Sequence, residues 1–118
     1  MIYIIDDDKY VRKGFETLFK SAGFDSTSCE SAEDFLEVMK PFENDIILLD
    51  MHMPGMNGCE LLEYLSSHEI FYPVIIITAY DEIASRECAR KYGALAYLRK
   101  PVDSEALIDL IKYTVNPV

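Results

Sequence analysis

Short β-like runs alternate with amphipathic segments along the whole sequence, and this alternation limits the possible folds more than any other feature. The runs that predict strands occupy residues 2–5, 26–29, 45–49, 74–78 and 95–98. The five segments that follow them carry apolar residues three and four positions apart, which predicts amphipathic helices. Strands that alternate with helices are typical of a parallel sheet covered by crossover helices. We therefore predict an α/β fold built from βα units.

The composition of these runs predicts their places in the sheet. The runs at 2–5, 45–49 and 74–78 are almost continuously apolar, as expected for central strands that are buried on both faces. The run at 26–29 is polar and the run at 95–98 is mixed, so we place both at the edges of the sheet.

Length and composition predict a single domain over residues 1–118. Half of the 118 residues are apolar, which is enough for one cooperative core. The longest apolar runs are far shorter than the roughly 20 residues needed to span a bilayer, and the first residues lack the basic region of a signal peptide. We expect a cytoplasmic protein without membrane contact. The net charge of -10 argues against direct contact with nucleic acid, whose phosphates are also negative.

The three cysteines, Cys29, Cys59 and Cys88, are far apart and form neither a CxxC pair nor a zinc-binding pattern with histidine. We interpret all three as small apolar residues of the core. A catalytic thiol would need a histidine beside it, and His52 alone lies near a candidate site.

Polar residues end the predicted strands. In an open parallel sheet, ligands bind outside the carboxyl ends of the strands. The residues at these ends are Asp6, Asp7, Asp8, Asp50, Thr78 and Lys100. If the first and third strands are neighbours, Asp6, Asp7 and Asp50 converge and repel one another by roughly 4 kcal/mol per pair at 4 Å and an effective dielectric of 20. Such a cluster needs a cation, and oxygen ligands beside a phosphate suit magnesium.

Asp50 is the strongest candidate for chemistry. It ends an apolar run and precedes a turn that contains Pro54 and Gly58. An aspartate held there can attack phosphorus and form an aspartyl phosphate. Lys100 can neutralise developing phosphoryl charge, and Thr78 can donate a hydrogen bond to a phosphoryl oxygen. Lys100 could equally be an ion-pair partner of the aspartates, and Asp8 could cap the first helix instead of serving the site.

These residues lie in segments that resemble the receiver domains of bacterial two-component response regulators. The resemblance rests on Ile-Ile-Asp6-Asp7-Asp8, Leu-Leu-Asp50-Met-His-Met-Pro54-Gly-Met-Asn-Gly58, Ile-Ile-Ile-Thr78-Ala79 and Lys100-Pro101, in that order. It covers the full length of the chain. It implies a (βα)5 three-layer sandwich with a five-stranded parallel sheet of order 2-1-3-4-5, the flavodoxin-like arrangement.

The resemblance also implies roles for the site residues. Asp50 would be the phosphoacceptor, and Asp7, Asp50 and the main-chain carbonyl of His52 would bind Mg2+ (or Mn2+), with Asp6 acting through water. Lys100 and Thr78 would contact the phosphoryl group.

The same resemblance implies a conformational switch and a set of tuning residues. Thr78 and Tyr97 would move together on phosphorylation, although Tyr97 could also be an ordinary aromatic of an edge strand. The Lys100-Pro101 bond would be cis. His52 and Tyr80 stand at positions that vary in the family, and we hypothesise that their bulk hinders the attacking water and slows dephosphorylation.

The implied partners are a sensor histidine kinase or phosphotransfer protein as phosphoryl donor, and an output domain, for example of the transcriptional type, or a downstream protein as target. A phosphorylation-dependent homodimer through the fourth and fifth helices is a further expectation. Such a protein is a phosphorelay switch that catalyses its own phosphorylation and slow autodephosphorylation, and it is not an enzyme in the usual sense.

Two alternative functions share parts of this pattern. A haloacid-dehalogenase-type phosphatase also uses an aspartyl phosphate, but His52 stands where its second acid belongs. A receiver-like binding module that is never phosphorylated would usually lack the acceptor or the acidic pair. A dinucleotide site is disfavoured because no GxGxxG follows the first strand. A calcium loop that begins at Asp6 is disfavoured because Val11 stands where that loop requires glycine.

Overall fold

A computed structural model describes residues 1–40 and 45–115, and within these ranges strands and helices alternate as predicted. The strands are β1 (Ile2–Ile5), β2 (Ser26–Cys29), β3 (Ile46–Asp50), β4 (Val74–Thr78) and β5 (Ala96–Arg99). The helices are α1 (Lys9–Ser21), α2 (Ala32–Val38), α3 (Gly58–Ser67), α4 (Ile83–Lys91) and α5 (Ser104–Val115). All strands pair in parallel in the order β2-β1-β3-β4-β5, which confirms the predicted fold class and the two edge strands.

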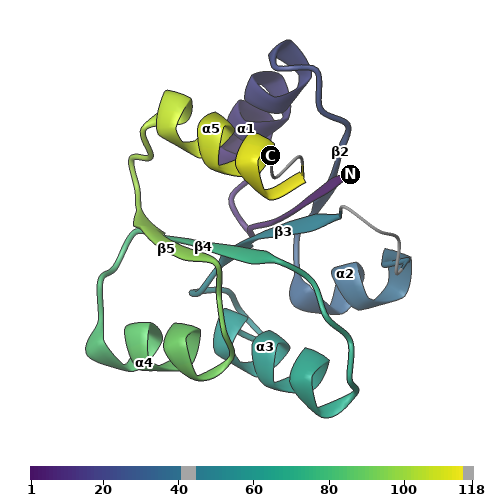
Figure 1. The fold of residues 1–118 in the computed structure, drawn as a ribbon. Coiled ribbons are helices and arrows are strands. Elements are labelled where there is room, and N and C mark those ends of the chain that lie inside the picture. The colour runs from purple at the N-terminus through teal and green to yellow at the C-terminus, as the bar shows by residue number, and fades with distance from the viewer. Residues whose placement is uncertain (41–44, 116–118) are drawn as a thin grey trace.

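Helices cover both faces of the sheet, with α1 and α5 on one side and α2, α3 and α4 on the other (Figure 1). Alternate strand residues supply the two halves of the core, because successive side chains point to opposite faces. Ile2 and Ile4 pack with Phe19 of α1 and with Leu107 of α5. The opposite half contains Tyr3, Ile5, Phe35, Leu61, Ile76 and Cys88. Central strands buried on both faces explain the continuous apolar runs.

Two strands begin and end one residue later than the sequence predicts. β3 extends to Asp50 because the main chain of this residue still pairs with Ile77 of β4. β5 extends to Arg99, which pairs with Thr78. Asp50 is therefore the last residue of a central strand, and the sheet fixes the position of its main chain.

The interpretation of the cysteines is wrong for two of the three. Cys59 of α3 and Cys88 of α4 form a disulfide across 29 residues of sequence, with their Cα atoms 6.0 Å apart. Their separation in the sequence conceals the contact, because α3 and α4 become neighbours only when the sheet forms. Cys29 is a free, buried thiol, as expected. In the described part of the chain, no helix combines the length and apolar character that a membrane crossing requires.

Candidate functional site

The strand-end acids converge at one edge of the sheet. Asp6 follows β1 and Asp50 ends β3, which are neighbouring strands, and both side chains are buried. Asp7 is exposed at the rim. Each of the three offers a carboxylate oxygen that lies within 4.8 Å of the oxygens offered by the other two. The sheet thus brings together the acidic cluster that the sequence predicts.

Lys100 places a positive charge against this cluster. Its Nζ donates a hydrogen bond of 2.9 Å to Oδ2 of Asp6 and lies 3.9 Å from Oδ2 of Asp50. Burial lowers the pKa of Lys100, but the hydrogen bond to Asp6 and the charge of Asp50 outweigh burial, so the pKa is raised above 10.5. The main-chain N–H of Lys100 donates to the carbonyl of Thr78 at 2.8 Å, and the Lys100-Pro101 bond is cis.

One lysine does not balance the negative charge around Asp50. Burial and, after it, the charge of Asp6 raise the pKa of Asp50 to about 6, although the charge of Lys100 and the hydrogen bond from the N–H of His52 lower it. The N–H of His52 donates to Oδ1 of Asp50 at 3.3 Å. A buried carboxylate with an excess of negative charge around it fits a cation, and an all-oxygen ligand set suits Mg2+ better than zinc.

Hydrogen bonds from Asp8 and Arg12 hold Asp6 in place. Its Oδ1 accepts a hydrogen bond of 2.9 Å from the N–H of Asp8, and its carbonyl accepts one of 2.7 Å from the guanidinium of Arg12. Asp8 itself is the N-cap of α1, and its carboxylate accepts hydrogen bonds from the N–H groups of Tyr10 and Val11. Of the two roles considered for Asp8, the structure therefore shows the helix cap.

The loop after Asp50 is packed closely against the end of β3. A Cβ on Gly58 would lie 2.8 Å from the carbonyl oxygen of Asp50 and 2.8 Å from Cα of Met51. The N–H of Gly58 donates to the carbonyl of Met51 at 3.2 Å. Asn57 and Glu60 then begin α3 with a reciprocal capping box. Gly58 is thus required for this close approach, whereas the sequence indicated only a turn.

The hydroxyl of Thr78 is not free to bind a ligand in this structure. It donates to the carbonyl of Tyr80 at 2.9 Å and accepts from the N–H of Tyr80 at 3.2 Å. Thr78 is completely buried at the end of β4. A phosphoryl oxygen would have to compete with Tyr80 for this hydroxyl.

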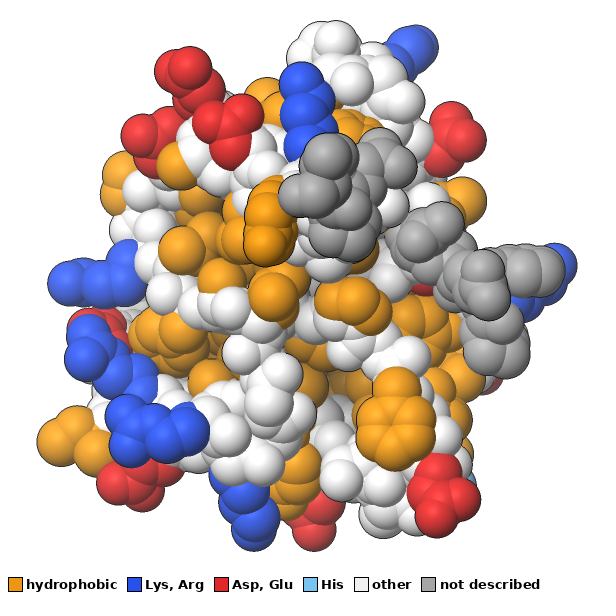
Figure 2. Space-filling model, in the orientation of Figure 1, with side chains coloured by type: hydrophobic (Ala, Val, Ile, Leu, Met, Phe, Trp, Pro, Cys, Tyr) orange, Lys and Arg blue, Asp and Glu red, His pale blue; other side chains and the backbone are white. Residues whose placement is uncertain are grey.

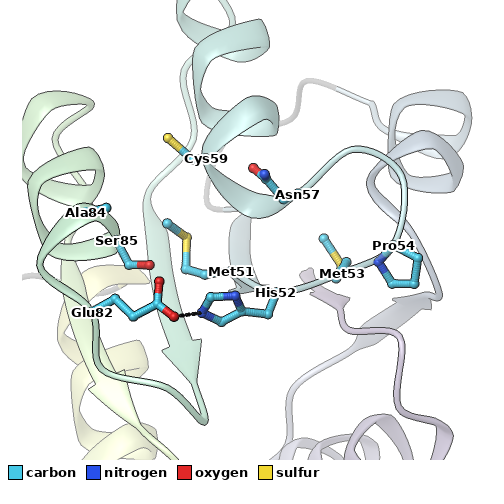
Figure 3. Close-up of a pocket in the computed structure, with 9 residues that line it drawn as sticks. All are labelled: Met51, His52, Met53, Pro54, Asn57, Cys59, Glu82, Ala84 and Ser85. Carbon is cyan, nitrogen blue, oxygen red and sulfur yellow. Dashed lines mark ion pairs between the residues drawn. The ribbon is translucent and has the colours of Figure 1, made fainter.

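Two bulky side chains meet beside the acidic cluster. The rings of His52 and Tyr80 pack edge to face with centroids 5.5 Å apart. Nε2 of His52 lies 4.0 Å from a carboxylate oxygen of Glu82, as Figure 3 shows. His52 and Glu82 border a pocket of about 510 Å³ between the β3–α3 loop and the start of α4. The contact with Glu82 was not predicted, because no sequence pattern links residues 30 apart in two loops.

Tyr97 lies apart from the acids, on the edge strand β5. Its ring packs against the half of the core that contains α3 and α4, and its hydroxyl is buried without a hydrogen-bond partner among the described residues. The guanidinium of Arg86 lies 5.9 Å from the ring centroid. Arg86 also pairs with Asp81 in the β4–α4 loop. Tyr97 is therefore turned inward and contacts α4.

Comparison with known proteins agrees with the geometry. Residues 2–112 match the family described as the response regulator receiver domain. The chain is similar to the transcriptional regulatory protein FixJ of Bradyrhizobium diazoefficiens, with 32% identity over 98% of this chain and 56% of the relative. It is also similar to the DNA-binding transcriptional regulator NtrC of Escherichia coli K12, with 31% identity over 98% of this chain and 25% of the relative. The chain thus spans about half the length of FixJ and a quarter of NtrC.

Solved structures show the same fold. The response regulator StyR superposes with a TM-score of 0.88 and 38% identity over 97% of this chain and 58% of that chain. The crystal structure of FixJ-N superposes with a TM-score of 0.86 and 31% identity over 99% of this chain and 94% of that chain.

Proposed function

Because the chain belongs to the family of response regulator receiver domains, we propose that it accepts a phosphoryl group on Asp50 in a Mg2+-dependent reaction and switches its α4–β5–α5 face in response. The observation that supports this most directly is the convergence of Asp6, Asp7 and Asp50 within 4.8 Å at the carboxyl ends of two neighbouring strands. The proposed domain comprises residues 1–118.

The acidic cluster and the loop after β3 would hold the metal. Asp7, Asp50 and the main-chain carbonyl of His52 would bind Mg2+ (or Mn2+), and Asp6 would act through water. When bound, the ion offsets the charge of the carboxylates and of phosphoryl oxygens. The raised pKa of Asp50 supports this site, because burial and the charge of Asp6 both disfavour its carboxylate form and a bound cation would offset them.

Asp50 and Lys100 would perform the phosphoryl transfer. A carboxylate oxygen of Asp50 forms a bond to phosphorus while the bond between phosphorus and the donor breaks, and the donor leaves with the bonding electrons. Lys100 lies 3.9 Å from Asp50 and would stabilise the negative charge of the phosphoryl oxygens. The protein would also catalyse the slow hydrolysis of its own aspartyl phosphate, and His52 and Tyr80 would slow that step by hindering access of water.

The phosphoryl group would act on the α4–β5–α5 face through Thr78. If its hydroxyl leaves Tyr80 for a phosphoryl oxygen, the short loop that connects β4 to α4 must change, because both hydrogen bonds with Tyr80 break. Tyr97 contacts α4 through Arg86 and would respond to the movement. Thr78 and Tyr97 are therefore the proposed switch residues.

The proposed output face differs in charge from the rest of the protein. Figure 2 shows Lys and Arg side chains gathered on the side of the molecule that carries α4 and β5. Arg86, Arg90, Lys91 and Arg99 of these elements are exposed, although the whole chain carries a net charge of -10. A basic face on an acidic protein supports contact with an acidic partner surface, which could belong to an output domain, a downstream protein or the acidic part of a second copy.

A second surface suits the phosphoryl donor. A groove of about 530 Å³ lies between α1 and the loop that follows β5, and Tyr10, Phe15, Leu18, Pro101 and Val102 contribute to its lining. It adjoins Lys100 and therefore the site. We propose that a sensor histidine kinase or phosphotransfer protein docks there, in the cytoplasm and without contact of this domain with nucleic acid or membrane.

Incubation with acetyl phosphate and Mg2+, followed by intact mass spectrometry, tests the proposed function. We expect an adduct of one phosphoryl group that is lost in Asp50→Asn and when Mg2+ is chelated. The matched control Asp109→Asn removes an exposed carboxylate of α5 and should be phosphorylated like the native protein. Inertness toward every phosphodonor would instead favour the non-phosphorylated binding module.

A further inference from the structure

The disulfide between Cys59 and Cys88 joins two helices that lie on the same face of the sheet, next to the phosphorylation site. Cys59 is the second residue of α3, and Cys88 lies in the middle of α4. In a reducing compartment, which we propose for this protein, disulfides are rare and those that occur are usually transient or redox-sensing. The bond therefore calls for a role beyond static stabilisation.

The two sulfurs differ in access. Cys59 is half-buried and lines the 510 Å³ pocket beside Met51 and Ser85, whereas Cys88 is buried in the core. Figure 3 shows the sulfur of Cys59 on α3 and, across the pocket, Ala84 and Ser85 on α4. The pocket therefore gives a small molecule a route from solvent to Cys59. The first turn of a helix also favours a thiolate, and Cys59 occupies that turn.

α4 has few other attachments to the rest of the protein. Its buried side chains are Ser85, Cys88 and Ala89, all of them small. Ile83 at its start is exposed, and its N-cap Glu82 makes no side-chain hydrogen bond to the described backbone. Weakly packed elements open and shift most readily. The covalent bond from α3 to the middle of α4 therefore adds a strong restraint to a helix that is otherwise held by small buried side chains and by the contacts of Arg86 with Tyr97 and Asp81.

We propose that Cys59 and Cys88 form a redox modification site for small disulfides such as oxidised glutathione, and that closing it restrains α4 and weakens the response of the α4–β5 face to phosphorylation. The regulatory part rests on the proposed function, whereas the exchange reaction does not. The restraint acts where the switch must move, because the loop from Thr78 leads directly into α4.

The reaction is thiol–disulfide exchange and needs no other oxidant. The thiolate of Cys59 attacks one sulfur of the small disulfide, the sulfur–sulfur bond breaks, and one small thiol leaves. The sulfur of Cys88 then attacks the mixed disulfide at Cys59 and releases the second small thiol. Two protons and two electrons pass from the protein thiols to the two small thiols. A small dithiol reverses both steps.

Cys29 provides a matched control. It is a free cysteine, buried like Cys88, and burial followed by the charge of Asp34 raises its pKa to about 11. A thiol with so little thiolate near neutral pH exchanges slowly. Cys29→Ala should therefore leave the redox behaviour of the protein unchanged.

Thiol titration of the native protein in glutathione buffers tests the exchange reaction. We expect the native protein and Cys29→Ala each to lose two free thiols in oxidised glutathione and to regain them in dithiothreitol, with Cys59 and Cys88 linked in peptide maps. Cys59→Ala and Cys88→Ala should form no internal cross-link. The site is refuted if the native protein does not form the bond, or if the bond persists in excess dithiothreitol.

Hydrogen exchange with and without beryllofluoride tests the regulation, using the oxidised and reduced forms of the same native protein. We expect α4 amides to exchange about tenfold more slowly in the oxidised form, and beryllofluoride to alter α4 exchange in the reduced form alone. Both forms should respond around Asp50. An equal α4 response in both forms would overturn the regulation, whereas no response around Asp50 in either form would overturn the proposed function instead.

Discussion

Nζ of Lys100 lies 2.9 Å from Oδ2 of Asp6, a full ångström nearer than it lies to Asp50. The lysine therefore serves as an ion-pair partner of the acidic cluster before any phosphoryl group arrives. Both roles considered for Lys100 are compatible, because a side chain held 3.9 Å from Asp50 needs only a small movement to contact a group attached there.

Lys100→Met should destabilise the metal-free protein by about 1 to 3 kcal/mol, because it leaves two buried carboxylates without their cation. It should also abolish the stabilisation that beryllofluoride gives in the presence of Mg2+. Urea denaturation measures both effects. Lys112→Met removes an exposed lysine of α5 and should change neither; equal effects of the two substitutions would argue against a special role for Lys100.

Asp50 should make the stability of the metal-free protein depend on pH. Its pKa is raised from the ordinary value of 3.8 to about 6 in the folded protein, so the folded state binds the proton more tightly than the unfolded state. The stabilisation from protonated Asp50 is complete below about pH 4 and is lost as the pH rises through about 6.

Asp50→Asn cannot titrate at this position. Above about pH 6 it should therefore be more stable than the native protein by up to about 3 kcal/mol. The difference should vanish at about pH 4, where the carboxyl is mostly protonated, and should shrink when Mg2+ is added near neutral pH. Denaturation of both proteins across the pH range measures it. A native protein as stable as the variant near neutral pH would show that the charge of Asp50 is already compensated.

The sequence predicts the parts of the site that depend on strand ends. Asp6, Asp50, Thr78 and Lys100 each end or follow a strand, and a parallel sheet brings such residues to one edge whatever the details of packing. The one-residue shift of β3 does not alter this, because Asp50 stays at the edge in either register.

Contacts between side chains from separate helices and loops could not be predicted in the same way. The disulfide of Cys59 with Cys88 and the approach of His52 to Glu82 depend on how α3 and α4 lie against each other, which no local pattern encodes. The engagement of Thr78 by Tyr80 is local in sequence, but a threonine at the end of a strand does not reveal whether its hydroxyl is free. Contacts of this kind would set the state of the proposed switch.

His52→Ala and Tyr80→Ala should each accelerate loss of the phosphoryl group from Asp50. The two rings pack edge to face beside the site, and removal of either should admit water more easily. We expect an increase of about three- to tenfold, or roughly 0.7 to 1.4 kcal/mol in activation free energy. The decay of the phosphorylated protein, followed by intact mass, measures it, and an unchanged rate in both variants would refute the hypothesis.

Gly58→Ala should destabilise the protein by about 1 to 3 kcal/mol, because an added methyl group forces the packed backbone apart. Its Cβ would meet the carbonyl of Asp50 and Cα of Met51 at 2.8 Å. Gly14→Ala is the matched control, since its Cβ meets nothing within 4 Å in α1, and it should stabilise the protein by up to about 1 kcal/mol. Thermal unfolding compares the two, and a neutral Gly58→Ala would show that the loop can relax.

The position of the phosphoryl group tests the central claim most directly. Borohydride reduces an aspartyl phosphate to homoserine, so phosphorylation with acetyl phosphate and Mg2+, followed by reduction and peptide mapping, identifies the acceptor. We predict homoserine at position 50, dependent on Mg2+, with Asp6 and Asp7 unmodified. Homoserine at Asp6 or Asp7, or at no aspartate, would contradict the assignment of Asp50 as the phosphoacceptor.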